Sequence, residues 1–122
     1  MNIPANLKYT DHDEWVSTDG DVVTVGITAY AQDQLGELVH VELPAVGKQV
    51  KAGEVVCEVE SVKAVAEIYA PAAGEVVEVN QALDDAAESI NSDPYGSWIY
   101  KLRVASPPAG LLDAAAYEAK VS

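Results

Sequence analysis

The stretch GEVVCEVESVKAVAEIYAP, residues 53–71, decides the fold. It contains two runs rich in valine, isoleucine and tyrosine, 53–60 and 65–70, with only a few residues between them. Such runs are typical of β-strands, and so short a connection is typical of a hairpin. Lys63 stands between the two runs and is therefore expected at an exposed turn.

More strands are predicted on both sides of this stretch. The pair Asp19-Gly20 separates 14–17 from 21–27, and an Asp-Gly pair between apolar runs is the strongest short-range signal for a hairpin. Strands are also predicted at 37–43, 74–80 and 98–104. The chain should therefore be mainly β.

The strand at 37–43, ELVHVEL, has an alternating pattern. The pattern places Val39, Val41 and Leu43 on a buried face, and His40 and Glu42 on a polar face. We therefore expect a half-buried strand with His40 among the polar side chains.

An internal repeat relates two of the strands. AGEVVCEVE (52–60) and AGEVVEV (73–79) match at seven positions once Cys57 is skipped. Chance similarity between valine-rich strands is one interpretation. The other is a pair of strand units related by a pseudo-twofold axis, which would place Lys63 at a turn joining two halves of a flattened barrel.

Short helices are predicted around the strands. Thr28 can cap a helix through AYAQDQL (29–35), and Gly36 suits its C-terminal end. Residues 83–90 are expected to form a helical turn or a loop. Asp113 can cap a last helix through AAAYEAK (114–120), whose apolar residues would let it lie against the sheet.

The composition limits the class of protein and its partners. A chain of 122 residues with 49% hydrophobic side chains can build one domain with one core. The first residues lack the pattern of a signal peptide and no apolar segment approaches the roughly 18 residues of a membrane span, so we expect a cytoplasmic protein that binds no membrane. The net charge of −13 disfavours nucleic acid and favours partners with basic docking surfaces.

No catalytic motif is found in the sequence. It has no glycine-rich phosphate loop, nucleophile elbow, HExxH or CxxC. Cys57 lies in an apolar alternating run, where a buried small hydrophobe is the usual role. The cluster of His12 with its acidic neighbours 11, 13 and 14 is expected to be a solvated loop, because four adjacent side chains cannot all face one metal ion. We therefore expect no catalytic residue and no metal site.

Lys63 is the residue that calls for a function. It is one of only six lysines and lies in a turn of small residues, where its amine is accessible. The nearby Glu58, Glu60 and Glu67 favour a charged ammonium, whereas a Schiff-base lysine must be available uncharged. Lys63 is therefore suited to carry a covalent group. The alternative is an unmodified lysine in a plain interaction domain.

The sequence resembles the lipoyl-bearing H-proteins of the glycine cleavage system over nearly its whole length. The resemblance is carried by LKYTDHDEWV (7–16), VGITAYAQDQLGELVHVELPAVGKQVKAGEVVCEVESVKA (25–64), YAPAAGEVVEVN (69–80) and DPYGSWIYKL (93–102). In this family ESVKA is the attachment segment, which implies that Lys63 is lipoylated. Lipoyl domains of 2-oxo-acid dehydrogenases usually have Asp-Lys-Ala at this point and biotin carriers Met-Lys-Met, so both fit less well.

The resemblance implies a fold and a function. The fold would be a flattened barrel-sandwich hybrid of the lipoyl/biotinyl-carrier type, a single lipoyl-carrier domain over 1–122 with its core at about 7–104 and a C-terminal helix at about 111–120. The function would be a non-catalytic carrier with lipoate in amide linkage to Lys63. It would take the aminomethyl group of glycine from glycine decarboxylase (P-protein) to the aminomethyltransferase (T-protein), and be reoxidised by dihydrolipoyl dehydrogenase (L-protein).

Other implications concern modification and assembly. A lipoate ligase or a lipoyl/octanoyl transferase would attach the group, and we expect a monomer. Two alternatives remain open: a lipoyl donor or relay that supplies lipoyl groups to other complexes, and a carrier of another prosthetic group such as biotin.

Two carboxylates are candidates for sheltering the loaded arm. An aminomethyl thioether ends in an ammonium and is prone to hydrolysis, so a groove that excludes water and offers an anion would preserve it. We expect Glu14 and Glu67 to provide that anion, and the resemblance implies the same positions. Two features depart from the family: Asp13 stands where a histidine is usual, and the loop 95–98 is about one residue shorter.

Overall fold

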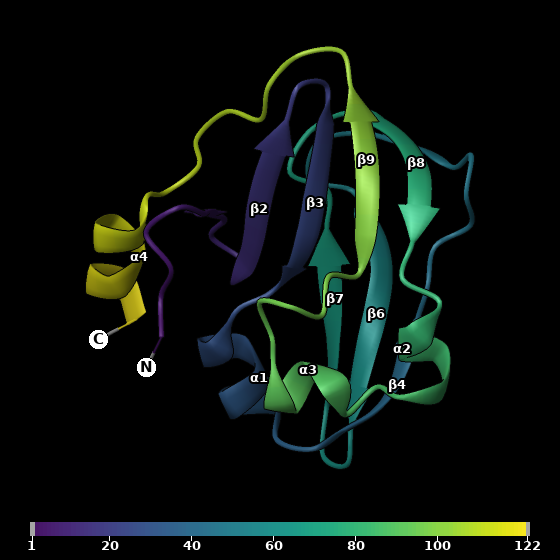
Figure 1. Ribbon diagram of the computed structural model, residues 1–122, viewed down its shortest axis with the longest axis vertical. Coiled ribbons are helices and arrows are strands. Elements are labelled where there is room, and N and C mark those ends of the chain that lie inside the picture. The colour runs from purple at the N-terminus through teal and green to yellow at the C-terminus, as the bar shows by residue number, and fades with distance from the viewer. Residues whose placement is uncertain (1, 122) are drawn as a thin grey trace.

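Two antiparallel sheets face each other in the computed structural model, which describes residues 2–121 (Figure 1). One sheet has six strands in the order β1-β2-β3-β9-β8-β5, and the other has three in the order β4-β6-β7. The strands are β1 (Lys8–Tyr9), β2 (Glu14–Asp19), β3 (Val22–Ile27), β4 (Leu38–Glu42), β5 (Gln49–Val50), β6 (Val55–Ser61), β7 (Val65–Tyr69), β8 (Gly74–Val79) and β9 (Tyr100–Val104). The expected barrel-sandwich hybrid of the lipoyl/biotinyl-carrier type is confirmed.

The main core fills the space between the two sheets. Alternate residues of the central strands point inward, such as Val23 and Val25 of β3 and Leu102 of β9, all with no exposed surface. The β2–β3 hairpin turns at Gly20, whose φ is +63°, as the Asp-Gly signal predicts. Consecutive strands therefore make up β1-β2-β3, whereas the pairs β3–β9 and β5–β8 join segments far apart in the sequence.

The predicted faces of β4 are partly wrong. Val41 is buried, but Val39 is 50% exposed, and Leu38 is buried instead. The register between β4 and β6 shifts between Leu38 and His40, which is a β-bulge. A bulge adds one residue to one strand, so the alternation reverses at that point. His40 and Glu42 are exposed, as expected.

The structure locates the two repeat strands and the Lys63 turn that lies between them in the sequence. The two repeat strands, β6 and β8, lie in different sheets. Lys63 lies in the turn that connects β6 to β7, which pair with each other in the smaller sheet. It therefore stands at the tip of one hairpin, and the twofold relation of the two repeat strands stays a prediction.

Four short helices among the described residues lie outside the sheets. These are α1 (Ala29–Leu35), α2 (Ala82–Asp85), α3 (Ser89–Ser92) and α4 (Ala114–Val121). Figure 1 shows α1, α2 and α3 gathered at the end of the molecule where the β6–β7 hairpin turns, with α4 to one side near the N-terminal segment. No helix among residues 2–121 is long and apolar enough to cross a membrane.

The predicted caps of α1 and α4 are observed. Thr28 Oγ1 accepts the N–H of Ala31 at 3.1 Å, and Asp113 Oδ1 accepts that of Ala116 at 2.8 Å. Tyr117 of α4 stacks on Tyr9 with ring centroids 4.7 Å apart. These rings belong to a second, smaller core cluster, so α4 packs at the edge of the large sheet.

Candidate functional site

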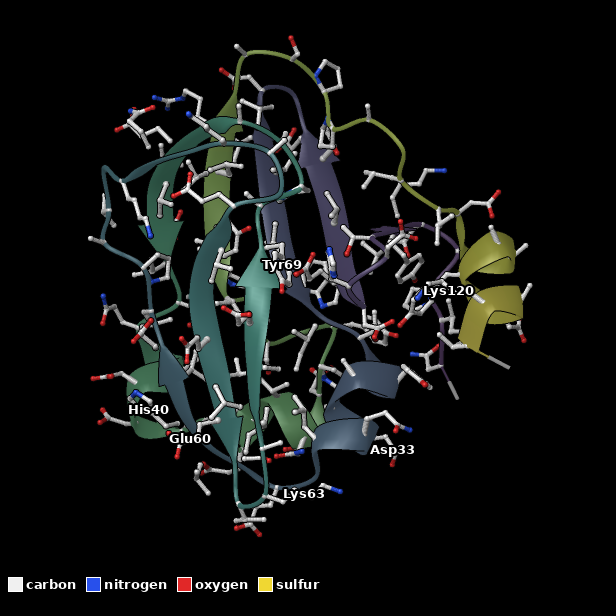
Figure 2. The ribbon with its side chains drawn as sticks, turned by 180° about the vertical axis from the view of Figure 1, so that it is seen from behind. Asp33, His40, Glu60, Lys63, Tyr69 and Lys120 are labelled. Carbon is white, nitrogen blue, oxygen red and sulfur yellow. The ribbon has the colours of Figure 1, made fainter. Side chains whose placement is uncertain are left out.

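Lys63 is exposed at the tip of the β6–β7 hairpin, as its place in the sequence predicts (Figure 2). The turn is fixed by Ser61, which is 5% exposed. Its Oγ accepts the N–H groups of Lys63 at 3.2 Å and Ala64 at 3.0 Å, and its N–H donates to the Ala64 carbonyl at 2.8 Å. A serine hydroxyl that replaces backbone contacts in this way rigidifies a tight turn. The amine is therefore presented on a stiff support.

The hairpin tip is also hydrogen-bonded to the segment between α1 and β4. Val62 N–H donates to the Glu37 carbonyl at 3.1 Å. A Cβ at Gly36 would lie 3.5 Å from Lys63 Cε, so the lysine stem passes over a residue without a side chain. Gly36 has φ +81° and ψ −152°, a region used almost only by glycine.

Asn91 of α3 holds the segment under Lys63 in place. Its Oδ1 accepts the Leu38 N–H at 2.9 Å, and its Nδ2 donates to the Gly36 carbonyl at 2.8 Å and to Gln32 Oε1 at 2.9 Å. One half-buried side chain thus links α1, α3 and the start of β4.

The carboxylates near Lys63 in sequence lie along the outer face of the small sheet. Glu58 is paired with Glu67 across β6 and β7, and Glu60 is paired with Val65. Ion pairs among residues 2–121 join Lys101 to Glu78, Arg103 to Asp21 and Lys120 to Asp13, and Lys63 takes part in none of these. The amine of Lys63 is thus held by no ion pair among the described residues.

Glu14 has a different environment from the one expected, because it is buried. Glu14 is the first residue of β2 and is 1% exposed. Oε1 accepts the Thr10 hydroxyl at 2.7 Å, and Oε2 accepts the Tyr69 N–H at 2.6 Å. Both carboxylate oxygens therefore have a partner, which is what a buried carboxylate requires.

Burial raises the pKa of the Glu14 carboxyl from 4.5 to about 7. The loss of hydration is the largest cause, the hydrogen bonds from Tyr69 and Thr10 oppose it, and the charge of Asp13 adds to it. Near neutral pH this carboxyl exists in both protonation states. It can therefore gain a negative charge when a cation comes close.

Tyr69 connects the two predicted carboxylates. Its N–H binds Glu14, and its hydroxyl donates to Glu67 Oε1 at 3.3 Å. The ring of His12 stacks on the Tyr69 ring with centroids 4.0 Å apart. Glu67 is exposed on the outer face of β7, whereas Glu14 is buried. Tyr69 therefore contacts a buried carboxylate through its N–H and an exposed carboxylate through its hydroxyl.

A small cavity opens beside Glu14. It has a volume of about 160 Å³ and is lined by residues 10–12, 14, 53, 69–71 and 109–111. Glu67 is not among the lining residues. Four residue steps of about 3.3 Å separate Val65 from Tyr69, so β7 spans about 13 Å between the Lys63 turn and this cavity.

Several residues of the site could not be identified from sequence. Thr10, Ser61 and Asn91 look like ordinary polar residues, and only Ser61 gives a signal, because serine two positions before an exposed residue favours a local turn. Tyr69 was expected only as a strand residue. The contacts of Tyr69 and Asn91 are long-range, so no local pattern reports them.

The polar cluster at 11–14 does not converge on one point. His12 stacks on Tyr69, Glu14 points into the interior, and Asp13 Oδ1 accepts the Tyr117 hydroxyl at 3.0 Å. Cys57 is 2% exposed, and burial raises the pKa of its thiol to about 12, in keeping with its expected role as a buried hydrophobe.

Proteins similar to this chain in sequence and fold are described as H proteins of the glycine cleavage system. Residues 7–122 match the family model of the glycine cleavage H-protein. The chain is 55% identical to a glycine cleavage system H protein of Laribacter hongkongensis, with 98% of each chain covered, and 54% identical to one of Phenylobacterium zucineum, with 95% of this chain and 98% of the relative covered.

A solved structure agrees with these sequence matches. The crystal structure of a glycine cleavage system H protein from Mycobacterium marinum superposes with a TM-score of 0.90 at 43% identity, covering 97% of this chain and 98% of the other. With the fold, the ESVKA turn and the full-length matches in agreement, the chain belongs to the glycine cleavage H-protein family, the lipoyl-bearing carrier component of the glycine cleavage system.

Proposed function

We propose that Lys63 carries lipoate in amide linkage, and that the protein shuttles the aminomethyl group of glycine between the enzymes of glycine cleavage. The observation that carries the proposal is the exposed Lys63 amine at the tip of a hairpin braced by Ser61. A modifying enzyme can bind such a turn without reshaping it. The small neighbours Gly36 and Ala64 leave room for a long side chain.

The lipoyl group supplies the dithiolane that accepts the aminomethyl group and is later reoxidised, while the protein supplies presentation and shelter. In this scheme the aminomethyl group comes from glycine decarboxylase and goes to the aminomethyltransferase, and dihydrolipoyl dehydrogenase restores the disulfide. A lipoate ligase or a lipoyl/octanoyl transferase attaches the group.

Glu14 and Glu67 are proposed to receive the ammonium end of the loaded arm. An arm of about eleven single bonds spans on the order of 14 Å when extended, similar to the length of β7 between Lys63 and the cavity beside Glu14. An ammonium near Glu14 favours the ionised carboxylate, and burial strengthens the attraction. Glu67 lies in water, so its attraction is weaker and screened by salt.

The first test is the intact mass of protein purified from its own host. A lipoyl addition that disappears in Lys63→Arg supports the proposal, because a guanidinium cannot form the amide. A biotinyl addition would indicate the alternative carrier, and no addition would indicate a plain interaction domain.

The second test concerns the two carboxylates. Lipoylated protein is loaded with methylamine, and the release of the aminomethyl group is followed in Glu14→Gln and Glu67→Gln. We expect faster release in both, with the larger effect in Glu14→Gln because Glu14 is buried. Unchanged rates in both variants would refute the shelter role.

A third test separates carrier from relay. A carrier restores glycine cleavage when mixed with the other three purified components. A relay instead supports the lipoylation of other complexes, so its deletion would leave those complexes unmodified while glycine cleavage is unaffected.

A further inference from the structure

The turn at residues 10–13 joins the C-terminal helix to the cavity beside Glu14. Thr10 and His12 line that cavity. Asp13 has φ +65°, the only positive φ among the described residues other than glycine. Aspartate tolerates this left-handed conformation better than most residues, but it still costs about 1 kcal/mol. A strained backbone conformation persists only where the surrounding contacts hold it, and such residues are common at functional sites.

Two side chains of α4 hold this turn. The Tyr117 hydroxyl donates to Asp13 Oδ1 at 3.0 Å, and Lys120 Nζ lies 3.8 Å from the same oxygen. Lys120 Nζ also donates to the Asp11 carbonyl at 3.2 Å. Figure 2 shows Lys120 reaching from α4 toward the body of the protein. The helix therefore holds the turn at both a side chain and a main-chain carbonyl.

The contact of Tyr117 continues into the body of the protein. Its hydroxyl has one hydrogen, which goes to Asp13, so the Thr28 hydroxyl must donate to Tyr117 across their 2.7 Å contact. Thr28 Oγ1 in turn accepts the Ala31 N–H at the start of α1. This chain of hydrogen bonds ends on a carboxylate, an arrangement in which each bond strengthens the next. Tyr117 is fully buried, so its position is fixed.

The same turn positions Glu14. Thr10 Oγ1 accepts the N–H groups of His12 at 3.2 Å and Glu14 at 3.3 Å, and donates to Glu14 Oε1. Asp13 N–H donates to the Thr10 carbonyl at 3.3 Å. A shift of Asp13 would therefore move the hydroxyl that binds the Glu14 carboxylate.

We propose that Asp13 is a positioning residue through which α4 sets the shape of the cavity beside Glu14 and thereby the retention of the amine-loaded arm. The part that concerns the arm rests on the proposed function of Glu14. The competing explanation is that the Tyr117 contact only docks α4. In that case its loss would lower stability and leave the surroundings of Glu14 unchanged.

A charge-matched pair of variants separates the two explanations. Asp13→Asn and Asp13→Gly remove the same negative charge, and both residues tolerate a positive φ. Only asparagine keeps an oxygen that can accept the Tyr117 hydroxyl. A difference between the two variants in the titration of Glu14 therefore reports a change in the position of the turn, and not the loss of the Asp13 charge.

The main measurement is the ¹³C NMR titration of the Glu14 carboxyl in protein without lipoate. We expect the midpoints of Asp13→Gly and Asp13→Asn to differ by about one pH unit, because both the Thr10 hydrogen bond and the burial that set the pKa of Glu14 depend on the turn. The ring-current shift of His12 on Tyr69 should also shrink in the glycine variant alone. Equal midpoints and equal ring-current shifts in the two variants would overturn the proposal.

Tyr117→Phe gives a second, independent comparison because it keeps the ring and every charge. We expect the Glu14 midpoint to shift there too, while Tyr30→Phe, which removes a hydroxyl of α1 outside this network, leaves it unchanged. A Tyr117→Phe protein that is less stable but titrates like Tyr30→Phe would show that α4 is only docked.

The arm is tested last, on lipoylated and methylamine-loaded protein. We expect release of the aminomethyl group to be several-fold faster in Asp13→Gly than in Asp13→Asn, a difference of the size that displaced positioning groups cause. If Glu14→Gln releases at the unchanged rate, the shelter role of Glu14 fails. The NMR comparison still decides whether α4 positions the turn, so the two failures are distinguishable.

Discussion

The buried Glu14 carboxyl should make the stability of the protein fall as the pH rises. Its pKa is about 7 in the folded protein against a usual value of 4.5. Between these values the folded state binds more protons than the unfolded state, so the free energy of unfolding decreases with increasing pH. The stabilisation relative to the ionised form is complete below about pH 4.5 and is lost by about pH 8.

The size of the effect follows from the same shift. Each pH unit between the two pKa values is worth about 1.4 kcal/mol, so the free energy of unfolding should fall by about 3 kcal/mol over this range. Because Glu14 is only 1% exposed, solvent screening does not reduce this figure much. A domain of this size is stable by about 5–15 kcal/mol, so the loss is measurable.

Glu14→Gln removes the titration and provides the test. Glutamine has an NH₂ group in place of one of the two carboxylate oxygens that accept from Thr10 and Tyr69, so one of these contacts is disrupted and the variant carries a constant cost of about 1–3 kcal/mol. The prediction therefore concerns the change with pH, which this constant does not alter. From pH 5 to pH 8.5 the variant should gain about 3 kcal/mol relative to the natural protein.

Urea unfolding at a series of pH values measures this difference. All other titratable groups are the same in both proteins, so their contributions largely cancel in the comparison. Glu88→Gln, at an exposed carboxylate of the α2–α3 connection, should give a curve parallel to that of the natural protein. Parallel curves for Glu14→Gln as well would refute the reasoning, since they would mean that burial does not hold the proton on Glu14.

Three further variants test the packing. Gly26→Ala places a Cβ 2.5 Å from the Trp15 ring and should lower the free energy of unfolding by about 1–3 kcal/mol or more, and an unchanged urea midpoint would contradict this. Gly36→Ala meets Lys63 Cε at an ordinary 3.5 Å, so its loss of about 1–3 kcal/mol should come from backbone strain alone, and an unchanged melting temperature would show that no strain arises. Tyr100→Phe removes a hydroxyl that is buried without a hydrogen-bond partner among the described residues, so the free energy of unfolding in urea should be unchanged or higher by about 1 kcal/mol. A marked loss of stability would show that the hydroxyl has a partner.

Much of the fold could be predicted because its signals are local. The Asp-Gly turn at Gly20, the Thr28 cap and the Asp113 cap each depend on residues within a few positions. The two-residue strands β1 and β5 were not predicted, since a strand of that length exists only through its partner. The bulge in β4 was missed for the same reason: it is a property of the pairing with β6, and the sequence of β4 alone shows a regular alternation.

The Lys63 turn could likewise be predicted from local sequence, whereas the cavity beside Glu14 could not. The Lys63 turn is held by Ser61, two residues away, so its exposure and shape follow from a short motif. The cavity depends instead on contacts between residues far apart, 55 positions for Glu14 with Tyr69 and 104 for Asp13 with Tyr117.

The two parts also fail differently. Presentation of the lysine should survive changes in α4, because the turn is held by Ser61 and by the segment around Gly36, which α4 does not contact in any of the hydrogen bonds described above. Shelter should be lost more easily, since a change in α4 or in the turn at residues 10–13 can disturb Glu14 without touching β6 or β7. Variants that remain fully lipoylated at Lys63 but lose the aminomethyl group early are therefore the expected result of substitutions in α4, and they would have no explanation if the hairpin alone protected the arm.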